Sequence, residues 1–362
     1  MLSVPRVLAS WENFYRVSGR QVCLVAQRPP RGWPSVPPEG ISRLVLLGGD
    51  GPARGLGRAA RTFFGLCRLM RRGDFVHHFS MGEWDGLTLA FFLVCVLKGA
   101  RIGLTLDYYP AEFQSRAPEP DSPAWDLLRR LFYRRCEWIS ALSARTAAGV
   151  AARFPYLSGR IRVVPNGWSS EEKRRLARRP VAAGKPSAFC LARHCHHRAI
   201  DILLMAWRDA SKEMDGAFLE LAGPDHEGGR YQRFAERLGI SDRVRFLGPL
   251  DRSQVWAKME ACLFFALPAR YGVSGQAALE AMSCGKAVVA SDTGGASDII
   301  EDGVSGLLVP PADVAGLAAR MVRLHRDADL RTRLGEAAYK RAQDYEWGKI
   351  REAYMGLWAG AS

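Results

Sequence analysis

The chain has 362 residues, of which 48% are apolar, and its formal net charge at pH 7 is +14. This length is enough for two ordinary domains, and the apolar content allows each of them to bury a core. The composition excludes a low-complexity or fixed-period repeat protein, and the positive charge favours an anionic partner such as a phosphate or an acidic membrane surface.

The first half of the chain predicts six strands. Short apolar runs lie at residues 20–26, 43–48, 74–79, 101–106, 137–142 and 161–164. A helix-like segment over 7–17 precedes the first strand, so the first domain is either trimmed at its start or begins further upstream. The apolar stretch 87–97 is too short to cross a bilayer and predicts a helix buried behind a sheet.

The second half predicts six more strands, at residues 188–192, 217–223, 243–248, 261–267, 287–291 and 306–309, and a final helix over 347–358. Continuous apolar runs that alternate with helices indicate parallel strands covered on both faces. The sequence therefore predicts an α/β protein with two doubly wound domains. We expect an N-terminal domain over 1–168, a linker over 169–186, a C-terminal domain over 187–340, and a last segment, 341–362, that packs back toward the N-terminal domain.

The basic residues form local clusters, and these allow two interpretations. The clusters are Arg68, Arg71 and Arg72; Arg129, Arg130, Arg134 and Arg135; and Lys173, Arg174, Arg175, Arg178 and Arg179. Aromatic and leucine side chains accompany the arginines over 63–72 and 127–138, which is typical of a surface that docks on an anionic membrane. The alternative is a solvated basic face.

The cysteines indicate a reducing compartment. Five of them, Cys23, Cys95, Cys136, Cys190 and Cys262, lie inside apolar runs and are expected to be small buried hydrophobes. The segment 1–15 lacks the long apolar core of a secretory signal. We therefore expect a cytoplasmic protein, peripheral on the inner face of the membrane if its basic surface docks there.

The segment 275–313 carries the clearest candidate binding site. Gly275 precedes a run of good helix formers that begins at Gln276, and the free N–H groups and dipole of such a helix end favour an anion. Glu280, on the second turn, is placed to reach ribose hydroxyls while the helix end holds a diphosphate. The loop of Thr293, Gly294 and Gly295 is a second place where the backbone could come close to a ligand.

This segment resembles the donor half of the family-4 retaining glycosyltransferases. The resemblance extends to the turn 165–167 (PNG), to 241–250 (SDRVRFLGPL) and to 265–271 (FALPARY), in the same order, and covers residues 135–345. It implies a GT-B fold, in which two Rossmann-like domains face a central cleft. It also implies a nucleotide-diphosphate sugar as donor, no further cofactor, and transfer with retention.

The resemblance assigns two arginines to the donor diphosphate. Arg193 matches the family's arginine after the first strand of the C-terminal domain, and Arg198 stands where lysine is usual. Ala199 replaces the usual glycine. Two fixed cations suit a leaving group that gains charge as the glycosidic bond breaks, so Arg193 and Arg198 are candidate catalytic residues. The alternative is a basic surface loop.

One departure from the family concerns its paired glutamates. Glu280 matches the second glutamate, but the position of the first is occupied by Gly272. In the family, the first glutamate approaches the transferred sugar. Gly272 therefore favours a rival hypothesis, a non-catalytic GT-B subunit that binds a partner or a membrane.

In the N-terminal domain, Asp107 follows a strand close to the place where the family carries a catalytic histidine. A carboxylate there could stabilise positive charge on the sugar or accept the proton of the acceptor; the alternative is an Asx turn. Side chains alternate along a strand, so one of His77 and His78 points into a layer of the fold, and the other is a candidate for a role in the cleft.

No metal site is expected. The four consecutive residues from His194 to His197 cannot close one tetrahedral site. Asp327 and Asp329 form a D-x-D string, but it lies in a charged helical stretch and is expected to be a solvated surface.

The leading hypothesis is a metal-independent glycosyltransferase that moves a sugar, in the simplest case a hexose, from a nucleotide sugar to an acceptor hydroxyl. The expected acceptor is lipid-linked or a growing surface glycan, so the pathway would be surface polysaccharide or glycolipid synthesis. A nucleic-acid partner is not expected, because the chain lacks interleaved aromatic and basic residues and any known nucleic-acid-binding module.

Overall fold

The structure is a computed structural model that describes residues 23–27, 43–47, 63–68, 70–72, 75–80, 86–106, 123–176, 187–271 and 275–359. The chain divides into two compact units. Unit 1 comprises Met1–Leu142, Thr146–Val164 and Arg351–Ser362, and unit 2 comprises Ser143–Arg145 and Pro165–Ile350. Apart from the short segment at 143–145, the chain enters unit 2 after Val164 and returns to unit 1 after Ile350.

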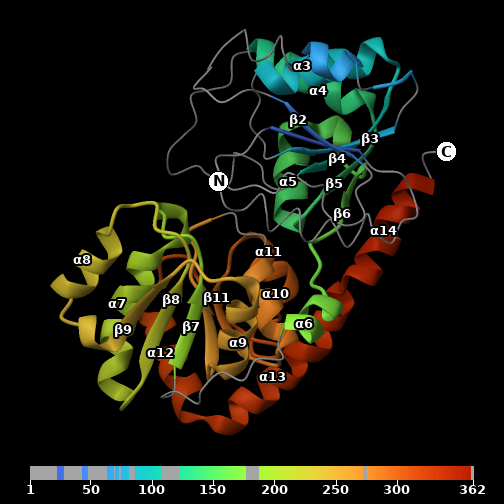
Figure 1. Cartoon of the computed structure of the whole chain (residues 1–362). Helices are drawn as coiled ribbons and strands as arrows, with labels where there is room; N and C mark the ends of the chain where they lie inside the picture. Colours follow the sequence, from blue (N-terminus) through green and yellow to red (C-terminus); the bar gives the residue numbers. More distant parts are fainter. Residues whose placement is uncertain are drawn as a thin grey trace. The chain divides into compact units, whose positions relative to one another are not determined.

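The strands lie where the apolar runs predict them, within three residues at either end. In unit 1 they are β1 (Cys23–Gln27), β2 (Arg43–Leu47), β3 (Phe75–Ser80), β4 (Arg101–Leu106), β5 (Cys136–Ala141) and β6 (Ile161–Val163). In unit 2 they are β7 (Ser187–Leu191), β8 (Phe218–Ala222), β9 (Val244–Gly248), β10 (Phe264–Leu267), β11 (Ala287–Ser291) and β12 (Leu307–Val309). All of the described pairings between them are parallel, so the α/β prediction is confirmed (Figure 1).

Helices connect these strands. They are α3 (Gly86–Leu97), α4 (Pro123–Arg135), α5 (Ala144–Arg153), α6 (Ser170–Leu176), α7 (Ile200–Ala210), α8 (Arg230–Arg237), α9 (Arg252–Ala261), α10 (Gln276–Ser283), α11 (Gly294–Ile299), α12 (Val314–Arg326), α13 (Ala328–Ala342) and α14 (Trp347–Ala359). Within the described part of the chain, none of the helices is long and apolar enough to cross a bilayer.

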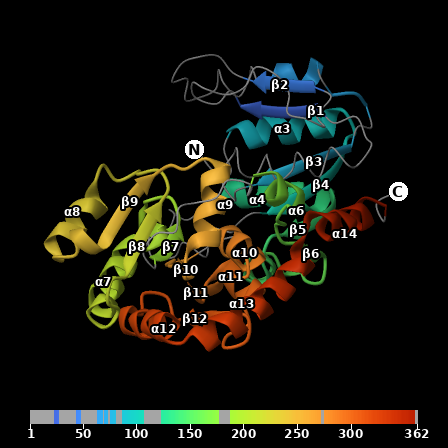
Figure 2. The same cartoon turned by 60° about the horizontal axis from the view of Figure 1, so that its bottom comes forward.

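Unit 2 is one six-stranded sheet in the order β12-β11-β10-β7-β8-β9. Alternate residues of its strands enter opposite cores: Phe264 and Ala266 of β10 face one layer, while Phe265 and Leu267 face the other. Helices α7, α8 and α12 cover the first face, and α9, α10 and α11 cover the second (Figure 2). Burial on both faces explains why these strands are continuous apolar runs.

Unit 1 contains a four-stranded sheet, β3-β4-β5-β6, and the pair β1-β2. Helices α3 and α4 pack on one face of the larger sheet through Phe92 and Phe132, whose rings lie 5.2 Å apart. On the other face, the indole of Trp138 lies so close to β4 that a Cβ added to Gly103 would come within 2.2 Å of it. Only glycine therefore fits at position 103.

The last helix, α14, contributes to unit 1. The side chain of Tyr354 is fully buried, and its hydroxyl lies 3.4 Å from the Thr105 hydroxyl of β4. Thr105 also lies within hydrogen-bond distance of Ser140 and of the His77 ring, at 2.8 Å in both cases. These contacts form a buried polar row across β3, β4 and β5 that anchors α14.

The segment through which the chain enters unit 2 is hydrogen-bonded to the segment through which it leaves. The indole nitrogen of Trp168 donates to the carbonyl of Ala342 at 2.7 Å, and the backbones of Trp168 and Trp347 are joined by a hydrogen bond of 3.0 Å. The stretch 169–186, expected as a linker, includes helix α6 over its first third. Residues 177–186 lie outside the described residues.

Three expectations about side chains are corrected or refined. Helix α3 is only half-buried, because Leu93, Val96 and Leu97 are exposed, the last at 68%. Arg129 is buried beside Asp126, at 3.5 Å, so it does not belong to the basic surface. The expected buried cysteines of the described chain, Cys95, Cys136, Cys190 and Cys262, are buried free thiols, whereas Cys23 lies outside the residues whose side chains are described.

Candidate functional site

The order of strands in unit 2 indicates where a ligand can bind. The chain proceeds from β7 outward to β8 and β9, and from the neighbouring β10 in the opposite direction to β11 and β12. The connections therefore diverge at the carboxyl ends of β7 and β10. In open parallel sheets, ligands bind in the crevice outside the carboxyl ends of the strands at such a switch point.

Arg193 and Arg198 both lie on the connection between β7 and α7. This loop contains a short 3-10 turn, His196–Arg198, and both arginines are half-buried. Burial, followed by the charges of Arg198 and Arg193, lowers the pKa of His197 to about 4. The charges of both arginines thus act on the same ring.

The β7–α7 loop is held from the carboxyl end of β10 by Arg270. Its guanidinium donates to the carbonyl of His196 at 2.8 Å and forks onto Asp201 at 2.9 and 2.5 Å, while its backbone N–H donates to the His197 carbonyl at 3.0 Å. Burial opposes ionisation of Asp201, but the hydrogen bonds and charge of Arg270 outweigh it and hold the pKa of Asp201 below its usual value. A bidentate pair of this kind fixes geometry as well as charge.

Ala199 closes this loop in a left-handed conformation, with φ +50° and ψ +38°. Such a conformation is easy for glycine and costs an L-residue roughly 1–2 kcal/mol. The backbone therefore retains the shape that glycine would give it, although the residue is alanine.

Gly275 precedes α10 with φ +69°. A Cβ added there would lie 2.8 Å from the carbonyl oxygen of Gly295 in α11 and 2.9 Å from Cδ1 of Ile299. The beginnings of α10 and α11 are thus in contact at the carboxyl edge of the sheet, and position 275 admits only glycine. Helix α11 has only six residues, and of the predicted loop Thr293, Gly294 and Gly295 it is Gly295 whose backbone makes this close approach.

Glu280 is 3% exposed, and its carboxylate is held by an arginine that sequence reasoning missed. Arg252 of α9 approaches its Oε1 atom at 3.0 Å and forks onto Glu172 of α6 at 2.9 and 2.8 Å. Hydrogen bonds and charge from Glu280 and Glu172 outweigh burial and raise the pKa of Arg252 above its usual value. Glu280 is therefore the buried member of an ion triad whose other members, Arg252 and Glu172, are partly exposed.

Gln276 connects the PNG turn to the same carboxylate. Its amide nitrogen donates to the carbonyl of Gly167 at 3.0 Å and lies 3.4 Å from Oε1 of Glu280. The side chain of Gln276, a predicted donor-binding residue, thus links two loops of unit 2.

Two of the predicted site residues, Asp107 and Gly272, lie outside the described residues. His77 and His78 lie on opposite faces of β3, as alternation requires. The His77 ring is packed against Trp138 and Tyr354, and the His78 ring is stacked on Phe91 at 4.6 Å. Both histidines are therefore packing residues of unit 1.

The residues considered for metal binding have other roles. The His194 ring is buried against Tyr231 and Phe246. The Asp327 carboxylate accepts from the Leu330 N–H and caps α13, whose first turn contains Asp329. Among the described residues, no group of three or more His, Cys, Asp or Glu side chains could hold a metal ion.

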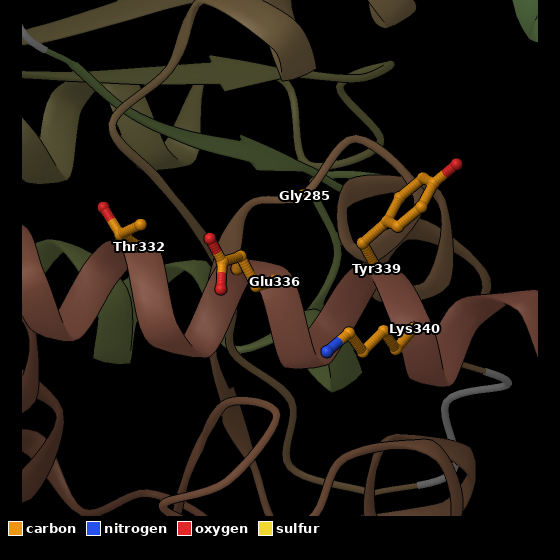
Figure 3. A pocket seen from close by; sticks show the side chains of 6 residues that line it. Gly285, Thr332, Glu336, Tyr339 and Lys340 are labelled. Atoms are coloured by element: carbon orange, nitrogen blue, oxygen red, sulfur yellow. The ribbon is translucent and has the colours of Figure 1, made fainter.

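A shallow hollow of about 420 Å³ lies elsewhere in unit 2, beside α13. Figure 3 shows Thr332, Glu336, Tyr339 and Lys340 projecting from successive turns of this helix next to Gly285. None of the predicted site residues lines it, so the candidate site is defined by the loops at the carboxyl edge of the sheet.

The comparisons with known proteins concern the same half of the chain most strongly. Residues 172–341 match the family model described as glycosyl transferases group 1. The chain is 31% identical over 261 residues to the 2-deoxystreptamine N-acetyl-D-glucosaminyltransferase of Streptomyces fradiae, covering 68% of this chain and 61% of that protein. It is 34% identical over 132 residues to the D-inositol 3-phosphate glycosyltransferase of Streptomyces bingchenggensis, covering 36% and 29%.

Two solved structures have the same fold. Sucrose-phosphate synthase from Thermosynechococcus elongatus superposes with a TM-score of 0.79 at 18% identity, covering 98% of this chain and 93% of that one. Anabaena HepE in complex with UDP and glucose superposes with a TM-score of 0.71 at 17% identity, covering 89% and 87%. The fold is thus the α/β fold of the GT-B glycosyltransferases. Residues 172–341 are thus similar to the group 1 glycosyl transferases, and the chain spans less than two thirds of the two curated relatives named above.

Proposed function

We propose that this protein transfers a sugar, in the simplest case a hexose, from a nucleotide-diphosphate sugar to an acceptor hydroxyl with retention. The observation that carries the proposal is the β7–α7 loop, where Arg270 and Asp201 fix the segment that bears Arg193 and Arg198 at the switch point of a parallel sheet. Two preorganised cations stabilise the diphosphate as it gains charge in the transition state.

The donor would lie across the loops of unit 2. Its diphosphate would face Arg193, Arg198 and the beginning of α10, where free N–H groups favour an anion. Its ribose would lie against Glu280. The solved structures of HepE contain UDP, UDP and glucose, or UDP-glucose, so UDP and UDP-glucose are the first ligands to test.

The experiment for donor binding is a thermal-shift screen with nucleoside diphosphates and their sugars, followed by calorimetry. A ligand that binds only the native state must stabilise it, by about 2.7 kcal/mol at a hundred times its Kd. Glu280→Ala should weaken the binding of both the diphosphate and the sugar nucleotide. Unchanged affinity in this variant would remove Glu280 from the site.

Gly272, at the position of the family's first glutamate, favours the competing proposal of a non-catalytic subunit. An assay for hydrolysis or transfer of a radiolabelled nucleotide sugar by the purified protein distinguishes the enzyme from the non-catalytic subunit. Turnover supports the enzyme, whereas binding without turnover favours the subunit. For the enzyme, the anomeric configuration of the first product, read from the proton coupling constant by NMR, tests retention.

Transfer would not require a divalent metal, because Arg193 and Arg198 provide the positive charge that a metal would otherwise supply. The test is turnover in excess EDTA. Activity that disappears with EDTA and returns with Mn²⁺ or Mg²⁺ would overturn this part of the proposal.

Asp107 would act on the acceptor side as a general base or as a stabiliser of charge on the sugar. Asp107→Asn should then abolish transfer while leaving the affinity for the nucleotide sugar unchanged. Normal transfer by this variant would leave Asp107 without a catalytic role.

The acceptor would be lipid-linked or a growing surface glycan, with unit 1 resting on the cytoplasmic face of an anionic membrane. The described part of unit 1 exposes Phe64 at 64% and Leu127 at 58%, together with Leu93, Val96, Leu97 and Leu131. Exposed arginines accompany them, namely Arg68, Arg71, Arg72, Arg130, Arg134 and Arg135. Each basic residue near an anionic surface contributes about 1 kcal/mol.

Liposome co-sedimentation tests this attachment. Vesicles with anionic lipid should bind the protein at low salt and release it at high salt, because surface attraction fades within a Debye length; neutral vesicles are the control. Leu127→Ser should weaken binding, while Tyr339→Ser, on the exposed face of α13 in unit 2, should leave it unchanged. No binding to anionic vesicles at low salt would favour a soluble acceptor.

A further inference from the structure

Glu280, the carboxylate proposed to bind the donor ribose, is one end of a chain of three charged side chains. Glu280 of α10 accepts from Arg252 of α9 at 3.0 Å, and Arg252 is itself gripped by both oxygens of Glu172, from α6. The guanidinium also lies 5.1 Å from the centre of the Trp256 ring. Arg252 is thus fixed by two carboxylates and one aromatic ring.

The guanidinium nitrogens of Arg252 are engaged by other side chains or buried, although 27% of the side chain is exposed. Its Nε atom is occupied by Glu172, its Nη2 atom is shared between Glu172 and Glu280, and its Nη1 atom is buried. Glu280 is therefore the group through which Arg252 can act on a ligand.

We propose that Arg252 is a positioning residue for the nucleotide ribose: it holds Glu280 ionised and in one orientation, and Glu172 sets the orientation of Arg252. This inference rests on the proposed function. An ionised carboxylate accepts hydrogen bonds at both oxygens, whereas a protonated one has an O–H group that competes with the ribose hydroxyls as a donor. A carboxylate buried as deeply as Glu280 tends to take up a proton unless a cation opposes it.

The triad also connects the ribose carboxylate to the segment through which the chain enters unit 2. Glu172 lies six residues after Asn166 of the PNG turn, and its neighbour Lys173 donates to the Ser283 carbonyl at the end of α10, at 2.7 Å. Gln276 holds the turn itself through the Gly167 carbonyl. Helix α10 is thus bound to this segment at its first turn, at Glu280 through Arg252, and at its last residue.

The test compares the affinity for UDP-glucose, whose diphosphate does not titrate near neutrality, between pH 5.5 and pH 8. For Arg252→Met, the ratio of variant Kd to wild-type Kd should rise as the pH falls, by up to about tenfold for each pH unit, because a Glu280 side chain that has lost its cation and taken up a proton must release that proton before it binds the ribose. Arg252→Lys retains the charge but not the fork, so its ratio should be constant across the pH range. A merely structural defect would give a constant ratio for both variants.

The chain offers a matched control on the same helix. Lys258 of α9 holds the buried carboxylate of Glu220 at 2.8 and 3.0 Å. Lys258→Met therefore also removes the nearest cation from a buried carboxylate, although Arg245 remains 3.8 Å away, and it does so at a position outside the proposed site. Its Kd ratio should stay near one at every pH.

A double-mutant cycle completes the test. In the Glu280→Gln background there is no carboxylate to hold, so adding Arg252→Met should leave the Kd at the value of the single variant. An additive loss, or a pH-independent ratio for Arg252→Met alone, would overturn the positioning role while leaving the proposed function intact. Failure of the wild type to bind any nucleotide sugar in the screen would instead overturn the proposed function, and this inference with it.

Discussion

The guanidinium of Arg270 and the carboxylate of Asp201 form a bidentate pair between the carboxyl end of β10 and the first turn of α7, with N–O distances of 2.9 and 2.5 Å. The same guanidinium donates to the His196 carbonyl. The pair thus joins the two connections that diverge at the switch point, and it sets the position of the loop that carries Arg193 and Arg198.

Arg270→Ala should release this loop. Hydrogen bonds to charged groups contribute about 1.5–3 kcal/mol each, so we expect the affinity for UDP to fall at least about tenfold. The affinity for uridine, which lacks the diphosphate, should not change. Arg320→Ala, which breaks the exposed pair with Asp302, is the control and should bind UDP as the wild type does. Equal losses for UDP and uridine would show that Arg270 does not act through the diphosphate.

Gly275→Ala should weaken donor binding and destabilise unit 2, because the new Cβ would lie 2.8 Å from the Gly295 carbonyl oxygen and must separate α10 from α11. Gly285 is a matched control at the other end of α10. Its φ is +67°, close to the +69° of Gly275, but the nearest atom to an added Cβ is 3.9 Å away. Gly285→Ala therefore carries the backbone strain alone, and the difference between the two variants in calorimetry measures the clash.

Ala199→Gly should stabilise the protein by about 0.5–1 kcal/mol, because glycine removes the strain of φ +50° at a modest cost in unfolded-chain entropy. Chemical denaturation measures the change. Ala312→Gly, at φ +64° on an exposed turn, should stabilise to a similar degree. A loss of stability in Ala199→Gly would mean that the methyl group makes contacts that outweigh the strain.

The protein should lose stability as the pH falls below 6.5. Burial lowers the pKa of His77 to about 3 and, with the charges of Arg198 and Arg193, that of His197 to about 4; it also lowers the pKa of His194 despite the nearby Asp225. Below pH 6.5 the unfolded chain therefore binds more protons than the native state. Each histidine costs about 1.4 kcal/mol per pH unit until its native pKa is reached.

Thermal unfolding between pH 7 and pH 5 measures this dependence. His194→Phe removes one buried titrating ring and should flatten the profile. An identical slope for His194→Phe would mean that this ring does not contribute.

The strands were predictable because a parallel sheet covered on both faces requires continuous apolar runs, and β10 and β11 are buried along their whole length. The two arginines of the β7–α7 loop could also be located, since they follow a recognisable strand. The roles of Arg252 and Arg270 could not be predicted from the sequence. The carboxylate partners of Arg252 lie 28 and 80 residues away in the sequence and that of Arg270 lies 69 residues away, and only the fold brings them together. The sequence also placed Arg129 in a basic surface cluster, because a run of arginines does not show which one the surrounding fold buries.

The burial of Tyr354 beside His77, Trp138 and Thr105 has a consequence for biosynthesis. The ribosome makes every residue of unit 2 before it makes this tyrosine, so unit 2 can fold while the polar row on β3, β4 and β5 still lacks its cover. The synthesis of unit 1 therefore begins before that of unit 2 and ends after it. A nonsense codon just before Tyr354 would therefore damage the N-terminal half of the protein while sparing the half that immediately precedes the codon.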